Sequence, residues 1–216
     1  MNNNTLTFLG IDSGFGNKNT SAYFECGENI TIIDCGFTVF QEVKNRFDFN
    51  KYNNINIIIT HLHNDHAGSL SQLILYLWFV YNKKTTVISN CSNIKEYLDI
   101  TGTPEEAYEL KKDMHNLKFI KTRHVKTLDS YGFLLSNNNK NILYTGDTTT
   151  IDPFLPYMND IDELYIDVSR NGGVHIKIDD VYEVLKKIRK KGVKIIFMHM
   201  DDEEYLRGWA KNLEQN

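Results

Sequence analysis

The sequence predicts an α/β fold in which two packed, mixed β-sheets carry helices on their outer sides. Apolar β-branched runs typical of buried strands, such as residues 55–59, recur along the chain. Between them lie segments with apolar residues at helical spacing, such as residues 179–191. Both halves of the chain contain strands and then helices, with no internal repeat or linker. We therefore expect a single domain spanning residues 1–216.

The first half is expected to form one of these sheets with its helices. A Gly27-Glu28-Asn29 turn between two β-branched runs predicts a pair of adjacent strands. Pro104 followed by Glu105 and Glu106 is typical of a helix start. The expected strands are residues 5–10, 21–26, 30–34, 55–59 and 85–89, and the expected helices are residues 39–49, 69–81, 93–101 and 104–115.

The second half is expected to form the other sheet. Residues 137–140 lie between two apolar runs and predict a hairpin. Gly192 is placed to end an amphipathic helix. The expected strands are residues 117–122, 131–136, 141–145, 164–168 and 193–198, and the expected helices are residues 179–191 and a tail from Glu203.

Composition limits the partners. The content of 41% hydrophobic and 24% charged residues is ordinary for a globular protein, and the net charge of −4 argues against binding long nucleic acid. Residues 1–5 lack the features of a signal peptide, and the longest apolar run, residues 73–81, is too short to cross a bilayer. We expect a cytoplasmic protein with no membrane contact, whose three cysteines are reduced and mostly buried thiols.

One short stretch, residues 61–68, concentrates the chemistry. His61, His63, Asp65 and His66 occupy six positions between a buried strand and an apolar helix. The ends of strands are where α/β proteins place their sites. Imidazoles and a carboxylate crowded beside a buried strand would repel one another or stay unsatisfied without a cation. The stretch therefore predicts a metal-binding loop.

Further candidate ligands follow other strands. His124, His175, His199 and Asp147 each lie at or near the exit of an expected strand, whereas His115 falls inside an expected helix and is interpreted as a surface residue. If these exits converge, two metal sites assemble. One would use His61, His63 and His124, the other Asp65, His66 and His199, with Asp147 bridging them. These ligands suit two zinc ions, with manganese or iron possible.

Two ions held close together favour hydrolysis by metal-bound hydroxide. They lower the pKa of a bridging water from 15.7 to about 7 and can hold both the attacked group and the leaving oxygen. Asp34, at the end of an expected strand, is either a cap for the next turn or a hydrogen-bond partner for a metal ligand. The loop of residues 13–20, with Gly14 and Gly16, is either a plain connection or a lining of the site.

The order His61-x-His63-x-Asp65-His66, a later histidine, Gly146-Asp147 and a final histidine resembles the metallo-β-lactamase fold superfamily over essentially the whole chain. This resemblance implies an αβ/βα sandwich with a dinuclear metal site at one edge. The oxygen-reducing diiron members usually carry glutamate where this chain has His63, which argues against a redox role.

Two features are similar to the tRNase Z-like phosphodiesterase branch. These are the start at Phe8-Leu9-Gly10 and His175, which resembles the histidine that this branch places beside the scissile phosphate. The resemblance implies that Asp65 and His175 act in catalysis, with His175 stabilising the transition state or protonating the leaving oxygen.

No long basic arm for tRNA is present, so a small phosphodiester is the expected substrate. The chain is similar to the compact phage anti-Pycsar enzymes that cleave cyclic nucleotides, which implies a cyclic-nucleotide phosphodiesterase and a homodimer. The alternatives are an ester, thioester or lactone hydrolase of the same fold, a tRNase Z-like ribonuclease, an inactive metal-binding module and iron-dependent oxidoreduction.

Overall fold

The computed structural model describes residues 4–215, so most of the polar start predicted at residues 1–5 lies outside the described residues. The chain divides into two compact units. One is Leu6–Met114, and the other is built from the described residues of Met1–Thr5 and His115–Asn216. The single domain over residues 1–216 stays a prediction.

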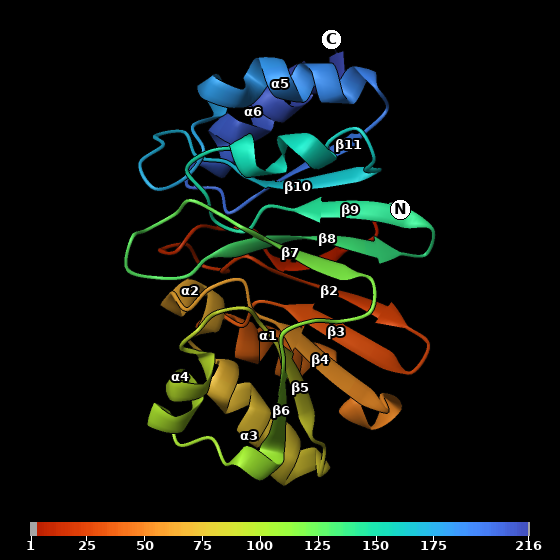
Figure 1. The fold of residues 1–216 in the computed structure, drawn as a ribbon, viewed down its shortest axis with the longest axis vertical. Helices are drawn as coiled ribbons and strands as arrows, with labels where there is room; N and C mark the ends of the chain where they lie inside the picture. Colours follow the sequence, from red (N-terminus) through yellow and green to blue (C-terminus); the bar gives the residue numbers. More distant parts are fainter. Residues whose placement is uncertain (1–3, 216) are drawn as a thin grey trace. The chain divides into compact units, whose positions relative to one another are not determined.

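The unit Leu6–Met114 contains a six-stranded mixed sheet in the order β1-β2-β3-β4-β5-β6. β1 to β3 pair antiparallel, whereas β3 to β6 run parallel to one another. Helices α1 and α3 lie on one side of this sheet (Figure 1). The strands are β1 (Thr7–Gly10), β2 (Ser21–Cys26), β3 (Asn29–Ile33), β4 (Asn54–Ile58), β5 (Thr85–Ile88) and β6 (Tyr108–Lys111). The helices are α1 (Val39–Arg46), α2 (Asn64–Ala67), α3 (Leu70–Tyr81) and α4 (Ile94–Ile100), with 3₁₀ turns η1 (Phe49–Lys51) and η2 (Glu105–Ala107).

The helix predicted at residues 104–115 is wrong. The start at Pro104 supports only the single 3₁₀ turn η2, after which β6 joins the parallel sheet with Thr85 opposite Tyr108. Tyr108-Glu109-Leu110 can alternate across a strand, and pairing with the edge of β5 satisfies its backbone groups, which outweighs local helix preference. His115 consequently lies in an exposed turn rather than a helix, and its placement on the surface is confirmed.

The second unit contains a five-stranded mixed sheet in the order β11-β10-β9-β8-β7. β9, β10 and β11 are parallel, and the predicted hairpin of β8 and β9 turns through Asn138 and Asn139, both in the left-handed region. Helices α5 and α6 pack together on one side of this sheet (Figure 1). The strands are β7 (Leu117–Lys121), β8 (Tyr131–Asn137), β9 (Lys140–Tyr144), β10 (Glu163–Asp167) and β11 (Lys194–Met198); the helices are α5 (Ile178–Lys190), α6 (Glu203–Gln215) and the 3₁₀ segment η3 (Asp152–Tyr157).

The cores of both sheets consist of the predicted apolar runs. Ile55, Ile57 and Ile58 of β4 are buried, and in the other unit the Phe133 and Tyr144 rings stack with centroids 5.0 Å apart. The rigid strands place their carboxyl ends, and the polar residues that follow, at fixed positions. Within residues 4–215, no helix combines the length and the apolar character needed to cross a membrane.

The cysteines follow the prediction. All three are free; Cys35 and Cys91 are buried, and Cys26 is exposed. Burial raises the pKa of the Cys35 thiol to about 12, although its Sγ lies 3.3 Å from the Ser69 hydroxyl. The Cys35 thiol is therefore neutral, and its side chain packs inside the core.

One buried carboxylate stabilises the second unit. Glu163, at the start of β10, is only 1% exposed and accepts hydrogen bonds from the Thr5 N–H at 3.0 Å, the Tyr165 hydroxyl at 2.8 Å and Lys140 Nζ at 2.8 Å. Burial alone would raise the pKa of Glu163, but these hydrogen bonds outweigh it and hold the pKa below its ordinary value. The ionised form therefore contributes stability above the unfolded pKa, and this contribution is lost as the pH falls through the folded pKa.

Replacing Glu163 with glutamine is expected to lower the free energy of unfolding by about 1–3 kcal/mol at pH 7, because the three donors lose their charged acceptor. The difference from wild type should shrink in acid, where Glu163 is protonated in both states. Urea unfolding at several pH values measures this, with the exposed Glu183→Gln on α5 as the matched control. An equal stability loss in both variants would contradict the assignment.

Candidate metal centre

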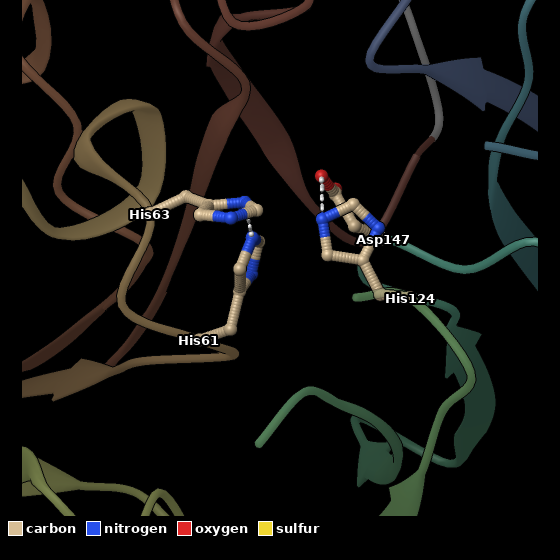
Figure 2. A group of neighbouring side chains, drawn as sticks. All are labelled: His61, His63, His124 and Asp147. Atoms are coloured by element: carbon tan, nitrogen blue, oxygen red, sulfur yellow. Dashed lines mark hydrogen bonds and ion pairs between the residues drawn. The ribbon is translucent and has the colours of Figure 1, made fainter. Parts of the chain in front are cut away.

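The predicted cluster of residues 61–68 lies at the exit of β4, in the unit Leu6–Met114. His61 and His66 are almost fully buried. The cluster is not entirely a loop, because Asn64–Ala67 forms the four-residue helix α2, with His63 preceding its first turn. His61 Nε2 and His63 Nδ1 face each other at 3.0 Å (Figure 2). Two ring nitrogens this close together are compatible with ligands that share one metal ion.

The Asp34 carboxylate fixes the orientation of this cluster. Asp34 follows β3 in the left-handed region, with φ of 60°, and is fully buried. Its Oδ1 accepts the Thr60 N–H at 2.8 Å, and its Oδ2 lies 2.8 Å from the Thr60 hydroxyl and 2.9 Å from His66 Nδ1. Of the two roles that the sequence left open for Asp34, the structure shows the contact with a candidate metal ligand.

These contacts set which ring nitrogens carry a lone pair. Because Asp34 accepts the proton of His66 Nδ1, His66 Nε2 is the atom left to bind a metal, and it lies 3.2 Å from Asp65 Oδ2. Thr60 Oγ1 donates to Asp34 and can accept from His61 Nδ1 at 3.2 Å, which likewise leaves His61 Nε2 as the ligand atom. Thr60, which the sequence reasoning missed, thus connects one carboxylate to a second histidine.

Burial raises the pKa of the Asp34 carboxyl, and the contacts with His66 and Thr60 act in the opposite direction. A cation held by His66 would further favour the ionised carboxylate.

Replacing Asp34 with asparagine is expected to weaken metal binding by about tenfold to a hundredfold, because the amide no longer fixes the Nδ1–H tautomer of His66. Competition against a chelator of known affinity measures the change. Circular dichroism and thermal unfolding of the variant separate this effect from a loss of folding. Unchanged metal affinity in a folded variant would contradict the role of Asp34.

The second unit carries a separate cluster of candidate ligands. His124, which follows β7, directs Nδ1 to the Val174 carbonyl at 2.9 Å, so that Nε2 is left as the ligand atom. That Nε2 lies 3.8 Å from Asp147 Oδ2, the pair drawn with a dashed line in Figure 2. His199 leaves β11 in the left-handed region, with φ of 55°, and its Nε2 lies 3.5 Å from the same oxygen.

His175 joins this cluster through a carboxylate that the sequence reasoning missed. Its Nδ1 lies 3.0 Å from Oδ2 of Asp167, the last residue of β10, and its ring stacks on His199 with centroids 4.6 Å apart. Asp167 is fully buried, and burial raises the pKa of its carboxyl while His175 and His199 act to lower it. Three potential ligand atoms of Asp167, His175 and His199 lie within 4.8 Å of one another. Asp167 could have been found in the sequence, because it is a carboxylate at the end of an apolar strand, as Asp34 is.

The loop carrying His175 is itself held in place. The Asp201 carboxylate accepts hydrogen bonds from the Ser169 hydroxyl at 2.7 Å and from the Arg170 N–H at 2.8 Å. The Ser169 oxygen in turn accepts a hydrogen bond from the Gly172 N–H at 2.8 Å. These bonds hold the start of the loop that leads from β10 to His175.

All eight predicted site residues are thus found in two clusters. His61, His63, Asp65 and His66 belong to one unit, and His124, Asp147, His175 and His199 to the other. The donor set is imidazole and carboxylate throughout, and in His61, His66 and His124 a hydrogen bond at Nδ1 leaves Nε2 available. These clusters are compatible with a metal site.

Comparison with solved structures gives the class of protein. The structure matches that of the metallo-beta-lactamase fold protein YhfI from Bacillus subtilis with a TM-score of 0.76, at 17% identity, over 96% of this chain and 92% of the other. The match to human tRNase Z, short form, has a TM-score of 0.68 at 14% identity, over 92% and 93% of the two chains. YhfI is described as a probable metallo-hydrolase and is 25% identical over 74% of this chain and 70% of its own length. Fold and clusters together define a metal-dependent hydrolase of the metallo-β-lactamase fold.

The sequence profile of the anti-Pycsar protein Apyc1 family matches residues 4–98 and 87–211, and the chain belongs to this family. A relative of that name from Bacillus phage 010DV004 is 24% identical, over 91% of this chain and 89% of its own length.

Proposed function

We propose that the two clusters together bind two metal ions, zinc being the expected metal and manganese or iron the alternatives. His61, His63 and His124 would hold one ion, Asp65, His66 and His199 the other, and Asp147 would bridge them. The donor types suit these metals, and the hydrogen bonds that Asp34 accepts from His66 and Val174 accepts from His124 leave the Nε2 atoms available. When bound, such ions lower the pKa of a water molecule to about 7 and offset negative charge on a phosphoryl oxygen.

We further propose that the reaction is hydrolysis of a small phosphodiester, with a cyclic nucleotide as the substrate. The observation that carries this proposal is the His175–Asp167 pair, with 3.0 Å between Nδ1 and Oδ2. A histidine whose Nδ1 is held by a buried carboxylate can carry a proton on Nε2 and donate it. Cleavage of an unactivated phosphodiester needs such a donor, because its leaving group is a poorly stabilised alkoxide.

Each residue then has a defined task. Water attacks phosphorus, the bond from phosphorus to the ribose oxygen breaks, and His175 Nε2 gives its proton to that oxygen. The Asp65 carboxylate, beside His66 Nε2, accepts a proton from the attacking water. Asp167 orients His175 and stabilises its charged form before transfer.

The family and the charge support this substrate. The family name describes its members as anti-Pycsar proteins, and one solved structure that shares the fold is a tRNase Z. The net charge of −4 argues against a long nucleic acid as substrate. A homodimer and a cytoplasmic location, both predicted from the sequence, stay predictions; sedimentation of the purified protein tests the first.

The deciding experiment assays 3′,5′-cyclic nucleotides, cyclic dinucleotides, RNA and carboxylic, thio- and lactone esters with zinc, manganese or iron, and with EDTA. We expect metal-dependent cleavage of cyclic nucleotides that EDTA abolishes. Cleavage of esters without phosphodiesters would establish the ester hydrolase instead, and cleavage of RNA alone a ribonuclease. A metal-loaded protein that turns over none of these substrates would contradict the proposed enzyme.

A further inference from the structure

The loop between β1 and β2, residues 11–20, is joined by hydrogen bonds although it contains no helix or strand. Asp12 anchors it: its N–H donates to the Lys18 carbonyl at 3.0 Å, its Oδ2 accepts the Lys18 N–H at 2.9 Å, and its carbonyl accepts the Thr20 N–H at 3.1 Å. Asn19 donates its N–H to the Thr38 hydroxyl at 2.8 Å, and its Oδ1 accepts the Thr38 N–H at 3.2 Å. The loop therefore holds one shape and is joined to the segment that follows β3.

Both of these segments touch the candidate metal ligand Asp65. A Cβ atom added to Gly14 would lie 3.1 Å from Asp65 Oδ2, and one added to Gly36 would overlap the Asp65 carbonyl oxygen. At Gly36 this approach excludes any side chain, whereas at Gly14 a side chain would make a tight contact with the Asp65 carboxylate. Gly14 thus brings the backbone of the loop directly against the carboxylate.

The residue that follows each of these glycines is an exposed phenylalanine. Phe15 is 107% exposed and Phe37 is 61% exposed. An isolated exposed phenylalanine is ordinary, but both of these lie one peptide, about 3.8 Å between Cα atoms, from a backbone in contact with Asp65. Hydrogen bonds at both ends of the loop, at Asp12 and at Asn19, reduce the backbone entropy that is lost when a ligand covers the ring.

We infer that Phe15 is a substrate-specificity residue that stacks on the nucleobase of the substrate. This inference rests on the proposed function, because it places the phosphodiester at Asp65. In a nucleoside cyclic phosphate the base is joined to the phosphate through a single ribose. The base of a substrate whose phosphate lies at Asp65 would therefore lie a short distance from that residue. An aromatic face attracts the π-face of a base by dispersion and by removal of apolar surface from water.

The test compares substrates with and without a base. Wild type and Phe15→Ala are assayed on adenosine and uridine 3′,5′-cyclic phosphates and on ribose 3,5-cyclic phosphate. Loss of stacking should raise KM for the nucleotides about tenfold to a hundredfold. The kcat should change little, because the ring does not touch the reacting atoms, and activity on the base-free substrate should stay the same. Phe15→Trp should restore the KM, and Phe79→Ala on α3, 74% exposed in wild type, is the matched control.

A second measurement separates this inference from the proposed function. In Phe15→Trp, AMP or UMP should quench the added indole fluorescence, whereas ribose 5-phosphate should not. If wild type cleaves no phosphodiester, the proposed function fails, while selective quenching still supports base binding at Phe15. Absence of quenching, or an equal KM change with and without the base, overturns the inference. It is also overturned if Phe15→Ala changes only the mass measured by sedimentation, since the ring would then contact a second copy of the chain.

Discussion

Replacing His61 with alanine is expected to lower kcat/KM by about a thousandfold or more and to reduce the metal content of the purified protein. His61 is fully buried, and its Nε2 faces His63 Nδ1 at 3.0 Å. Without it, the proposed site would keep too few donors to hold the ion, and several kcal/mol of transition-state stabilisation that the metal would supply would be lost, each 1.36 kcal/mol corresponding to about tenfold in rate. Metal analysis by mass spectrometry and steady-state kinetics measure the two effects.

Two further variants test whether the effect of His61→Ala comes from the loss of a metal ligand. His63→Ala removes the facing nitrogen from a less buried position, so it tests metal binding with less risk to folding. His115→Ala, on an exposed turn of the second unit, should retain metal and activity. Full metal content and full activity in folded His61→Ala and His63→Ala proteins would rule out these residues as ligands.

Replacing His175 with alanine is expected to lower kcat on cyclic nucleotides by about 10²–10⁴-fold while leaving the metal content unchanged. The defect should depend on the leaving group. Bis-p-nitrophenyl phosphate releases a phenolate that needs little protonation, so its cleavage should fall much less than that of a cyclic nucleotide. A histidine that only supported the fold would reduce both activities equally.

Asp167→Asn provides the matched comparison for His175. Its amide keeps the size of the carboxylate but cannot stabilise a charged imidazole, so the variant should show the same leaving-group dependence to a smaller degree. Equal losses on both substrates in His175→Ala and Asp167→Asn would contradict proton donation by His175.

Local sequence patterns predicted most of the elements. The Ile-rich β4, the hairpin through Asn138 and Asn139 and the helix α5 that ends before Gly192 all follow from periodicity and turn chemistry. The error at β6 has a tertiary cause: Tyr108–Lys111 has no strong strand pattern and becomes a strand because the edge of β5 offers hydrogen-bond partners. The short helix α2 was also missed, since four residues are too few to show a helical period.

The candidate ligands could be recognised from the sequence because imidazole and carboxylate groups placed at the exits of buried strands have few other physical explanations. The residues that hold these side chains in place could not be recognised from the sequence. Whether Asp34 capped a turn or contacted a histidine stayed open until the fold placed its carboxylate 2.9 Å from His66 Nδ1. The pairing of Asp167 with His175 likewise depends on how the loop after β10 returns to the strand end.

The sequence by itself determined the types of the candidate ligand residues, their order along the chain and the alternation of strands and helices. Only the tertiary structure decided which nitrogen of His61, His66 and His124 remains available, which carboxylates contact the histidine rings, and that Gly14 lies beside Asp65. Residue identity and spacing are encoded locally, whereas a hydrogen bond between residues 32 positions apart, as between Asp34 and His66, exists only after the sheet has formed.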